Sequence, residues 1–355
     1  MSLSNLFKDR AYVFPHSDSA DIDYAFAKRV LYHIKPTFQV EDVLLTEIYD
    51  DYDVFLIREK KRGVLNLKVS LSDPEDILAT ETSVLKSTDS VATPHLLAGG
   101  SDCVGGEDIL YLLTYVGEGE SLRNMGRGAI FENRQELFRS YFSFAQTRPV
   151  RRKYQEILNS LVASWDIEKN FPSENLQAFK EYTNYQDCRE FLKILIEQIL
   201  RDFAELGDFP TQKCHGNLSL DSVFCDGANF YFDSLSRTSM GHPFIDFADF
   251  ILDAAIDKEQ ERKLLNEFCN EGKIEKDYVF YGRVYNLALR KKLVELVISY
   301  LKEVYLYDSY RYEKIINVSD TFSHLYNRFR KISIFEENRH FIMKTITEPI
   351  LGVKA

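Results

Sequence analysis

The chain has 355 residues, enough for two lobes with a sizeable buried core. Its 44 Lys and Arg residues against 55 Asp and Glu residues give a net charge of −11, which argues against a nucleic-acid-binding protein because such proteins present a basic surface. The five cysteines are scattered and odd in number, which favours a reducing compartment without a disulfide framework. Since the start carries no apolar signal segment and no apolar run of about 18 residues occurs, we expect a cytoplasmic protein that binds neither membranes nor nucleic acid.

The first third of the chain alternates between helical and strand-like patterns. Apolar residues at helical spacing predict a helix over residues 21–34, and a second helix is predicted to start near residue 73. Alternating or continuous apolar runs predict strands over residues 41–49, 54–58, 64–69 and 109–116. The first three of these strands are expected to form an antiparallel meander.

A lysine lies inside the third predicted strand, where its charge needs a partner. Lys68 follows Leu65 and Leu67 in an alternating apolar run, and Glu81 lies on the helix predicted next. We expect an ion pair between Lys68 and Glu81. The alternative is that Lys68 marks an edge strand, where a lysine discourages aggregation.

The remainder of the chain is predicted to be mostly helical. The longer helices are predicted over residues 130–144, 186–206, 257–270 and 276–307, and shorter ones over residues 311–316, 319–331 and 336–346. The helix over residues 257–270 is expected to be capped by Gly272. The tyrosines of this region are interpreted as helix packing; they are Tyr300, Tyr305, Tyr307, Tyr310 and Tyr312. The basic clusters at residues 148–153 and 290–292 are interpreted as solvated surfaces, each of which could also meet an anionic partner.

Residues 214–249 combine a tight loop, a hairpin and a polar turn that leads into a helix. Residues 215–218 (His-Gly-Asn-Leu) open the segment, and the turn at residues 226–228 (Asp-Gly-Ala) predicts a two-stranded hairpin. Asp233 closes the second strand. A loop and hairpin with one acid at a strand end is the layout of phosphoryl transfer by kinases, where one acid positions the attacking hydroxyl and the strand-end Asp holds magnesium.

This segment resembles the aminoglycoside phosphotransferases and choline kinases, a branch of the protein-kinase-like fold with the pattern H-G-D-x-x-x-x-N, a hairpin, I-D-x and G-D-P-x-x-D-L-A. The matching residues are His215, Gly216, Leu218, Asp233, Gly241, Pro243, Asp246 and Ala248. The resemblance covers about residues 40–255. It implies a two-lobed α+β fold, with a small antiparallel-sheet N-lobe (residues 1–116) and a large, mostly helical C-lobe (residues 117–355). The catalytic loop would span residues 214–233, and a helical acceptor region residues 255–355.

The resemblance also implies a nucleotide site. Lys68 would contact the phosphates of ATP or GTP, and Glu81 would orient that lysine. The hinge that follows the last strand would hold the base through its backbone, at Tyr115, Val116 and Gly117. In the C-lobe, His215 would be a buried structural residue of the catalytic loop, and Asp246 would brace that loop.

Four features depart from the family's pattern. Asn217 stands at the position of the catalytic acid, Ser222 replaces the metal-binding Asn, and His242 replaces the Asp of the G-D-P motif. Asn217 can hydrogen-bond a hydroxyl but cannot take its proton, whereas Ser222 still offers a hydroxyl to Mg²⁺ beside Asp233. The turn at residues 50–53 has three carboxylates and no glycine, which disfavours a bound phosphate.

These departures predict a degenerate phosphotransferase, a pseudokinase, in which Asn217 and Asp233 occupy the catalytic positions and Asp233 and Ser222 the metal site. One alternative is an active ATP-dependent kinase that phosphorylates a hydroxyl of a small molecule or peptide, with Asn217 as positioner or Asp221 as a substitute base. Another is an interaction scaffold that binds a protein partner and no nucleotide.

Overall fold

The protein forms two compact units that each draw on more than one stretch of the chain. In the computed structural model, unit 1 comprises Met1–Val150 and Leu220–Thr238, and unit 2 comprises Arg151–Ser219 and Ser239–Ala355. Within the described residues no helix is long and apolar enough to cross a membrane. The residues described are 24–48, 52–61, 63–71, 77–88, 92–115, 119–165, 185–227 and 229–311.

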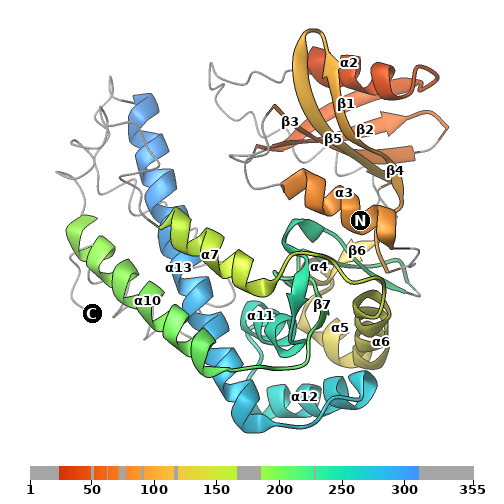
Figure 1. Ribbon diagram of the computed structural model, residues 1–355. Helices are drawn as coiled ribbons and strands as arrows, with labels where there is room; N and C mark the ends of the chain where they lie inside the picture. The colour runs from red at the N-terminus through yellow and green to blue at the C-terminus, as the bar shows by residue number, and fades with distance from the viewer. Residues whose placement is uncertain are drawn as a thin grey trace. The chain divides into compact units, whose positions relative to one another are not determined.

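Unit 1 is built on a five-stranded antiparallel sheet with the order β1-β2-β3-β5-β4 (Figure 1). Its strands are β1 (Val40–Ile48), β2 (Asp53–Glu59), β3 (Gly63–Ser70), β4 (Leu96–Val104) and β5 (Glu107–Tyr115). The first three form the meander predicted from the sequence. Gly63 has φ 82°, which lets the chain reverse between β2 and β3.

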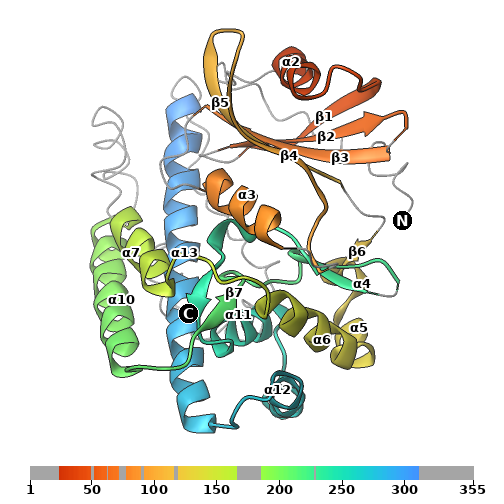
Figure 2. The ribbon, with the colours of Figure 1, turned by 45° about the vertical axis from the view of Figure 1, so that its right-hand side comes forward.

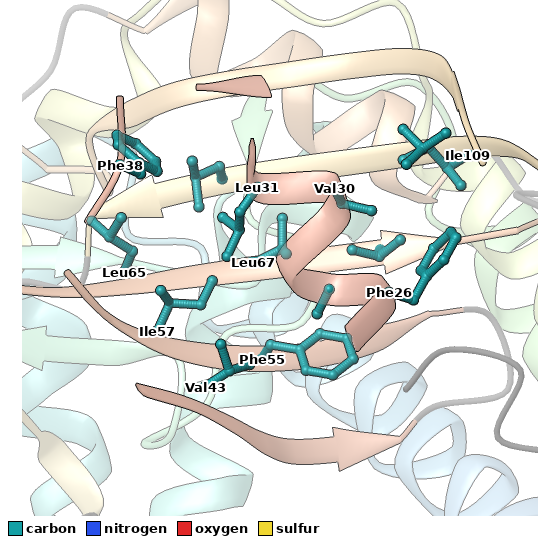
Figure 3. Packing of buried hydrophobic residues seen from close by; sticks show 14 residues of the cluster. Phe26, Val30, Leu31, Phe38, Val43, Phe55, Ile57, Leu65, Leu67 and Ile109 are labelled. Atoms are coloured by element: carbon teal, nitrogen blue, oxygen red, sulfur yellow. The ribbon is translucent and has the colours of Figure 1, made fainter. Parts of the chain in front are cut away.

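Helices cover both faces of this sheet: α2 (Tyr24–Ile34) lies on one face and α3 (Ile77–Ser87) on the other (Figures 1 and 2). Side chains alternate along a strand, so Leu65 and Leu67 of β3 point to the α2 side and join its apolar core (Figure 3). Lys68 follows Leu67 directly and therefore points to the opposite face, the α3 side, where it bonds to Glu81. The core on the α2 side also contains Phe26, Val30, Leu31, Phe55 and Ile57.

The rest of unit 1 is a second, smaller sheet with short helices. Strand β6 (Glu120–Ser121) pairs with β8, and β8 (Val223–Cys225) and β9 (Phe230–Phe232) form the predicted hairpin. The predicted single helix over residues 130–144 is wrong, because the helix is interrupted at Asn133, which has φ −112° and ψ 14°. The helical elements of this part are α4 (Leu122–Met125), α5 (Arg127–Glu132), α6 (Arg134–Ala145) and the 3₁₀ turn η1 (Leu235–Arg237).

Unit 2 is mostly helical, and its helices α10 (Tyr185–Glu205) and α11 (Phe244–Ala254) both pack against the long helix α13 (Tyr278–Arg311) (Figure 2). Its other elements are α7 (Tyr154–Ser164), α12 (Lys258–Gly272) and the strand pair β7 (Gln212–Cys214) and β10 (Ser239–Gly241). Gly272 does not cap α12 as predicted; Lys273 takes the left-handed conformation there, with φ 52°. The helices predicted over residues 319–331 and 336–346, and the side chains of the tyrosine group, lie outside what the structure describes.

Candidate functional site

The predicted ion pair is present in unit 1. Lys68 Nζ donates to Glu81 Oε1 at 2.8 Å and to Oε2 at 3.0 Å. Both residues are buried, with 5% and 1% of their surface exposed. A buried ammonium group needs such a partner, because its transfer out of water is otherwise costly. The edge-strand interpretation of Lys68 is wrong, since β3 lies in the middle of the sheet.

A second acid and an aromatic ring complete the surroundings of this lysine. Asp233 Oδ1 lies 3.9 Å from Lys68 Nζ, and the centroid of the Tyr52 ring lies 5.8 Å from it. Burial alone would lower the pKa of Lys68, but Glu81, Asp233 and Tyr52 together raise it above its ordinary value. Lys68 is therefore held as a cation, the form that binds phosphate.

Glu81 also connects helix α3 to the segment that follows Asp233. Its Oε1 accepts the backbone N–H of Leu235 at 3.4 Å. One carboxylate thus bridges the strand that carries Lys68 and the turn η1. The arrangement fixes Lys68, Glu81 and Asp233 relative to one another within unit 1.

Asp233 and Ser222 are neighbours across the hairpin. The Asp233 backbone N–H donates to the Ser222 carbonyl at 2.9 Å, and the Ser234 N–H donates to Asp233 Oδ1 at 2.6 Å. The Asp233 side chain is 25% exposed, whereas Ser222 is buried. The described residues contain no cluster of three or more His, Cys or acidic side chains arranged to bind a metal. A carboxylate with a hydroxyl nevertheless fits Mg²⁺, which takes its other ligands from phosphate oxygens and water in kinase sites.

The predicted hinge is described only in part. Tyr115 ends β5, is 37% exposed, and donates its N–H to the His95 carbonyl at 3.0 Å. Val116 and Gly117 lie outside the described residues. Just beyond them, a Cβ atom at Gly119 would come within 2.9 Å of the Cys225 carbonyl oxygen. Only glycine therefore fits where the chain passes the hairpin.

In unit 2, Asp246 braces the start of the predicted catalytic loop. It is fully buried in α11, and it accepts the N–H groups of His215 at 2.6 Å and Gly216 at 2.8 Å. His215 is also fully buried, and its Nδ1 accepts the Asn217 N–H at 3.3 Å. These bonds agree with the structural roles that the resemblance implied for His215 and Asp246.

Asn217 has a partner that the sequence did not reveal. Lys292 of α13 donates from Nζ to Asn217 Oδ1 at 2.7 Å. The side chain of Lys292 is 18% exposed, and Glu295 Oε2 lies 3.9 Å from its Nζ. The only signal for Lys292 in the sequence is its place in a basic run, 75 residues from Asn217.

The interpretation of residues 290–292 as a solvated surface is wrong. Lys291 is 1% exposed and bonds to Asp249 of α11 at 2.5 Å. Arg290 forms an ion pair with Asp202 of α10. Successive positions on a helix point in different directions, so the three cations of this run face α10, α11 and the loop at Asn217 separately.

One further residue of the loop, Asp221, has a defined partner. Both oxygens of Asp221 accept from Arg123 Nε at 2.7 Å, and the Asp221 side chain is 65% exposed. This surface ion pair gives no support to Asp221 as a substitute base. Ser222 and Asp233 belong to unit 1 together with this pair, while Asn217 belongs to unit 2.

His242 takes over a capping role at the start of α11. Its Nδ1 accepts the Phe244 N–H at 3.1 Å. Its ring packs among Phe209, Phe244 and Phe280, with centroids 5.9, 4.6 and 4.8 Å away. Burial lowers the pKa of His242 to about 4, against a smaller opposing effect of Asp277. The ring is thus neutral near pH 7 and can accept the bond that an Asp would otherwise take.

Comparison with known proteins identifies the fold. No protein-family profile and no curated protein sequence matches the chain. Among solved structures, it is similar to aminoglycoside phosphotransferase APH(3'')-Id from Streptomyces rimosus in complex with ADP and streptomycin, with a TM-score of 0.53 and 17% identity over 77% of this chain and 98% of that one. It is also similar to a thermostable mutant of aminoglycoside phosphotransferase APH(4)-Ia in its apo form, with a TM-score of 0.51 and 11% identity over 76% and 90% of the two chains. The same enzyme's ternary complex with AMP-PNP and hygromycin B gives a TM-score of 0.51 and 12% identity over 78% and 92%. The predicted α+β, protein-kinase-like fold is confirmed.

Proposed function

We propose that this protein is a nucleotide-binding member of the kinase fold that transfers phosphate poorly or not at all. The observation that carries the proposal is the cluster of Lys68, Glu81 and Asp233, which keeps a buried cation beside a partly exposed carboxylate. That combination suits a nucleoside triphosphate with a divalent cation. Solved structures of the same fold contain ADP or AMP-PNP, which supports a nucleotide here.

In this proposal Lys68 contacts the phosphates of ATP or GTP, and Glu81 holds Lys68 in place. Asp233 and Ser222 hold Mg²⁺, which when bound neutralises charge on the phosphates. The hinge at residues 115–117 binds the base. The N-lobe spans residues 1–116 and the C-lobe residues 117–355, although the predicted boundary lies inside the compact unit 1.

The catalytic loop is the reason to expect weak transfer. Asn217 cannot accept a proton, and its amide oxygen is already bonded to Lys292. General-base catalysis typically contributes about 10²- to 10⁴-fold to a rate. An active kinase that phosphorylates a small-molecule or peptide hydroxyl is the second candidate, favoured by the intact Lys68–Glu81 pair. Solved relatives in fold contain the small molecules streptomycin and hygromycin B.

A thermal-shift measurement tests nucleotide binding. With a Kd of about 100 μM, 1 mM ATP stabilises the folded state by about 1.4 kcal/mol, so Tm should rise, and Mg²⁺ should enlarge the rise. Lys68→Met combined with Glu81→Gln should abolish the shift without leaving a buried, unpaired charge. Lys60→Met, in the exposed β2–β3 turn, is the matched control and should keep it.

The outcomes separate the candidate functions. An unchanged Tm at several millimolar ATP or GTP, with and without Mg²⁺, would contradict the proposal and favour a scaffold that binds a protein partner. A positive shift followed by measurable transfer of phosphate to an added hydroxyl acceptor would favour the active kinase. A shift without transfer or ATP hydrolysis is the expected result.

A further inference from the structure

We propose that Asn217 and Lys292 form a donor pair that binds an oxyanion, a phosphate or carboxylate group of a ligand. The inference deepens the proposed function and rests on it in treating residues 215–218 as the part of the loop that faces an acceptor. The question is whether position 217 donates or accepts hydrogen bonds. An acid at position 217 would accept a proton, whereas the pair seen here presents the N–H donors of Asn217 and Lys292 to a ligand.

The chemistry of lysine determines how the Asn217 amide is oriented. An ammonium group has three donors and no acceptor, so the group 2.7 Å from Lys292 Nζ must be the amide oxygen of Asn217. The amide nitrogen, with its two N–H donors, therefore points away from Lys292. Within the part of the chain that the structure describes, neither of these N–H groups has a protein acceptor.

Neighbouring contacts fix both members of the pair. Asp246 holds the loop by accepting two consecutive backbone N–H groups just before Asn217. On the other side, the residues preceding Lys292 anchor α13, Lys291 to Asp249 and Arg290 to Asp202. Donors that are positioned before the ligand arrives bind an anion with little loss of conformational freedom.

The local charge favours an anion over a cation. Glu295 lies 3.9 Å from Lys292 Nζ, beyond hydrogen-bond distance, and neutralises it only in part. Hydrogen bonds from an ammonium group to an anionic oxygen are about twice as strong as bonds between neutral groups. An amine at this place would instead meet the like charge of Lys292. We therefore expect a ligand with a phosphate or carboxylate at this position, unlike a cationic aminoglycoside.

The test follows the side-chain amide signals of Asn217 by NMR in the ¹⁵N-labelled full chain without nucleotide. The signals are assigned by their absence in Asn217→Ala. Inorganic phosphate and succinate are titrated separately, with chloride keeping the ionic strength constant. Saturable shifts with phosphate alone indicate a site for a phosphate group, and saturable shifts with succinate alone indicate a site for a carboxylate. Shifts in both titrations indicate a general oxyanion site. Each of these results supports the proposal.

Variants assign the binding to the pair. Lys292→Met should weaken the affinity at least about tenfold, whereas Lys292→Arg should retain it. Lys263→Met, an exposed lysine of α12, is the matched control and should have no effect. Asn217→Asp exchanges the amide donors for carboxylate acceptors and should lose anion binding although Lys292 is intact. Because this variant lacks the Asn217 amide signals, its titration is followed by the tryptophan or methyl signals of the protein.

Two results would overturn the proposal: no saturable shift with either anion, or unchanged affinity in Lys292→Met. Lys68→Met combined with Glu81→Gln should leave the anion titration as in the wild type, since these residues belong to unit 1. A protein that fails to bind nucleotide but passes the anion titration disproves the proposed function alone. The converse result disproves the donor pair alone.

Discussion

At the scale of single residues, the neighbour of Asn217 determines what a substitution there can achieve. Asn217→Asp is nearly isosteric, and a restored carboxylate would lie at hydrogen-bond distance from Lys292 Nζ. The ammonium group would stabilise the charged form and lower the pKa of the new acid, which makes it a weaker base. Asn217 and Lys292 therefore need to be changed together.

A general base typically contributes about 10²- to 10⁴-fold to a rate. We expect Asn217→Asp alone to raise ATP turnover by a smaller factor. Asn217→Asp with Lys292→Met should raise it further, as measured by phosphate release or transfer. Lys292→Met alone supplies the control, because it removes the cation without adding a base. Robust transfer by the wild type that falls on Asn217→Asp would instead make Asn217 a working part of the site.

His242 makes stability depend on pH. Its pKa is about 4 in the folded protein and about 6.5 when unfolded, so between these values the unfolded chain binds more protons. The stabilisation is complete above about pH 6.5 and is lost as the pH falls toward 4, by about 3 kcal/mol. Asp53 acts in the opposite direction, because burial raises its pKa to about 6.

Urea unfolding at pH 7 and pH 4 measures this effect. His242→Asn keeps an acceptor for the Phe244 N–H but does not titrate, and Asp53 is common to both proteins. The free energy of unfolding should therefore fall more steeply with acid in the wild type than in His242→Asn. Equal slopes would show that the ring is not held neutral.

At the scale of elements, the approach of helix α3 to the sheet determines whether Glu81 reaches Lys68. A Cβ atom at Gly99 of β4 would lie 2.9 Å from Thr82 Cγ2, 3.1 Å from Thr82 Oγ1 and 3.3 Å from Leu112 Cδ1. Thr82 is buried and follows Glu81 directly. Glycine at position 99 thus allows the close packing that positions the carboxylate.

We expect Gly99→Ala to destabilise the protein by about 1–3 kcal/mol, as overpacked sites do, and to weaken the nucleotide-dependent rise in Tm by displacing Glu81. Thermal unfolding with and without ATP measures both effects. Gly100→Ala is the matched control, since its Cβ would meet only the Tyr111 hydroxyl at 4.0 Å. The double variant Gly99→Ala with Thr82→Ala should recover part of the lost stability, because it removes the side-chain atoms that the new Cβ meets. No recovery would show that the contact with Thr82 is not the cause.

At the scale of the whole molecule, the fold could be predicted from local pattern and motif order. The meander, the hairpin and the helix that carries Glu81 each have a periodic signal. The partner of Lys68 follows from the cost of burying a charge. The interruption at Asn133 was missed because Ile130, Leu137 and Tyr141 keep helical spacing on its two sides. The cap at Lys273 was missed because glycine usually takes that conformation.

The contacts of the candidate site could be predicted where the partners are close in sequence or belong to the motif of residues 214–249. Glu81 lies 13 residues from Lys68, on the next element of the chain. Lys292 lies 75 residues from Asn217, and its contact depends on how α13 packs in unit 2. Periodicity cannot show which of three adjacent cations on a helix faces a given loop, and only the packing of α10 and α11 against α13 resolves this.

Unit 1 is assembled from two separate stretches of the chain, and this has a consequence for its synthesis. A ribosome must add the 69 residues 151–219 (219 − 150) before Leu220–Thr238 can emerge, which takes about 3–14 s at roughly 5–20 residues per second. During that interval the nascent chain already contains Lys68 and Glu81 but has no Asp233 beside the lysine and no Leu235 amide for the carboxylate. The rings of Tyr141 and Phe144 also lack Phe232, which they contact in the folded protein. The first half of the polypeptide thus leaves the ribosome with apolar side chains that are not yet covered, at the stage when chaperones bind nascent chains.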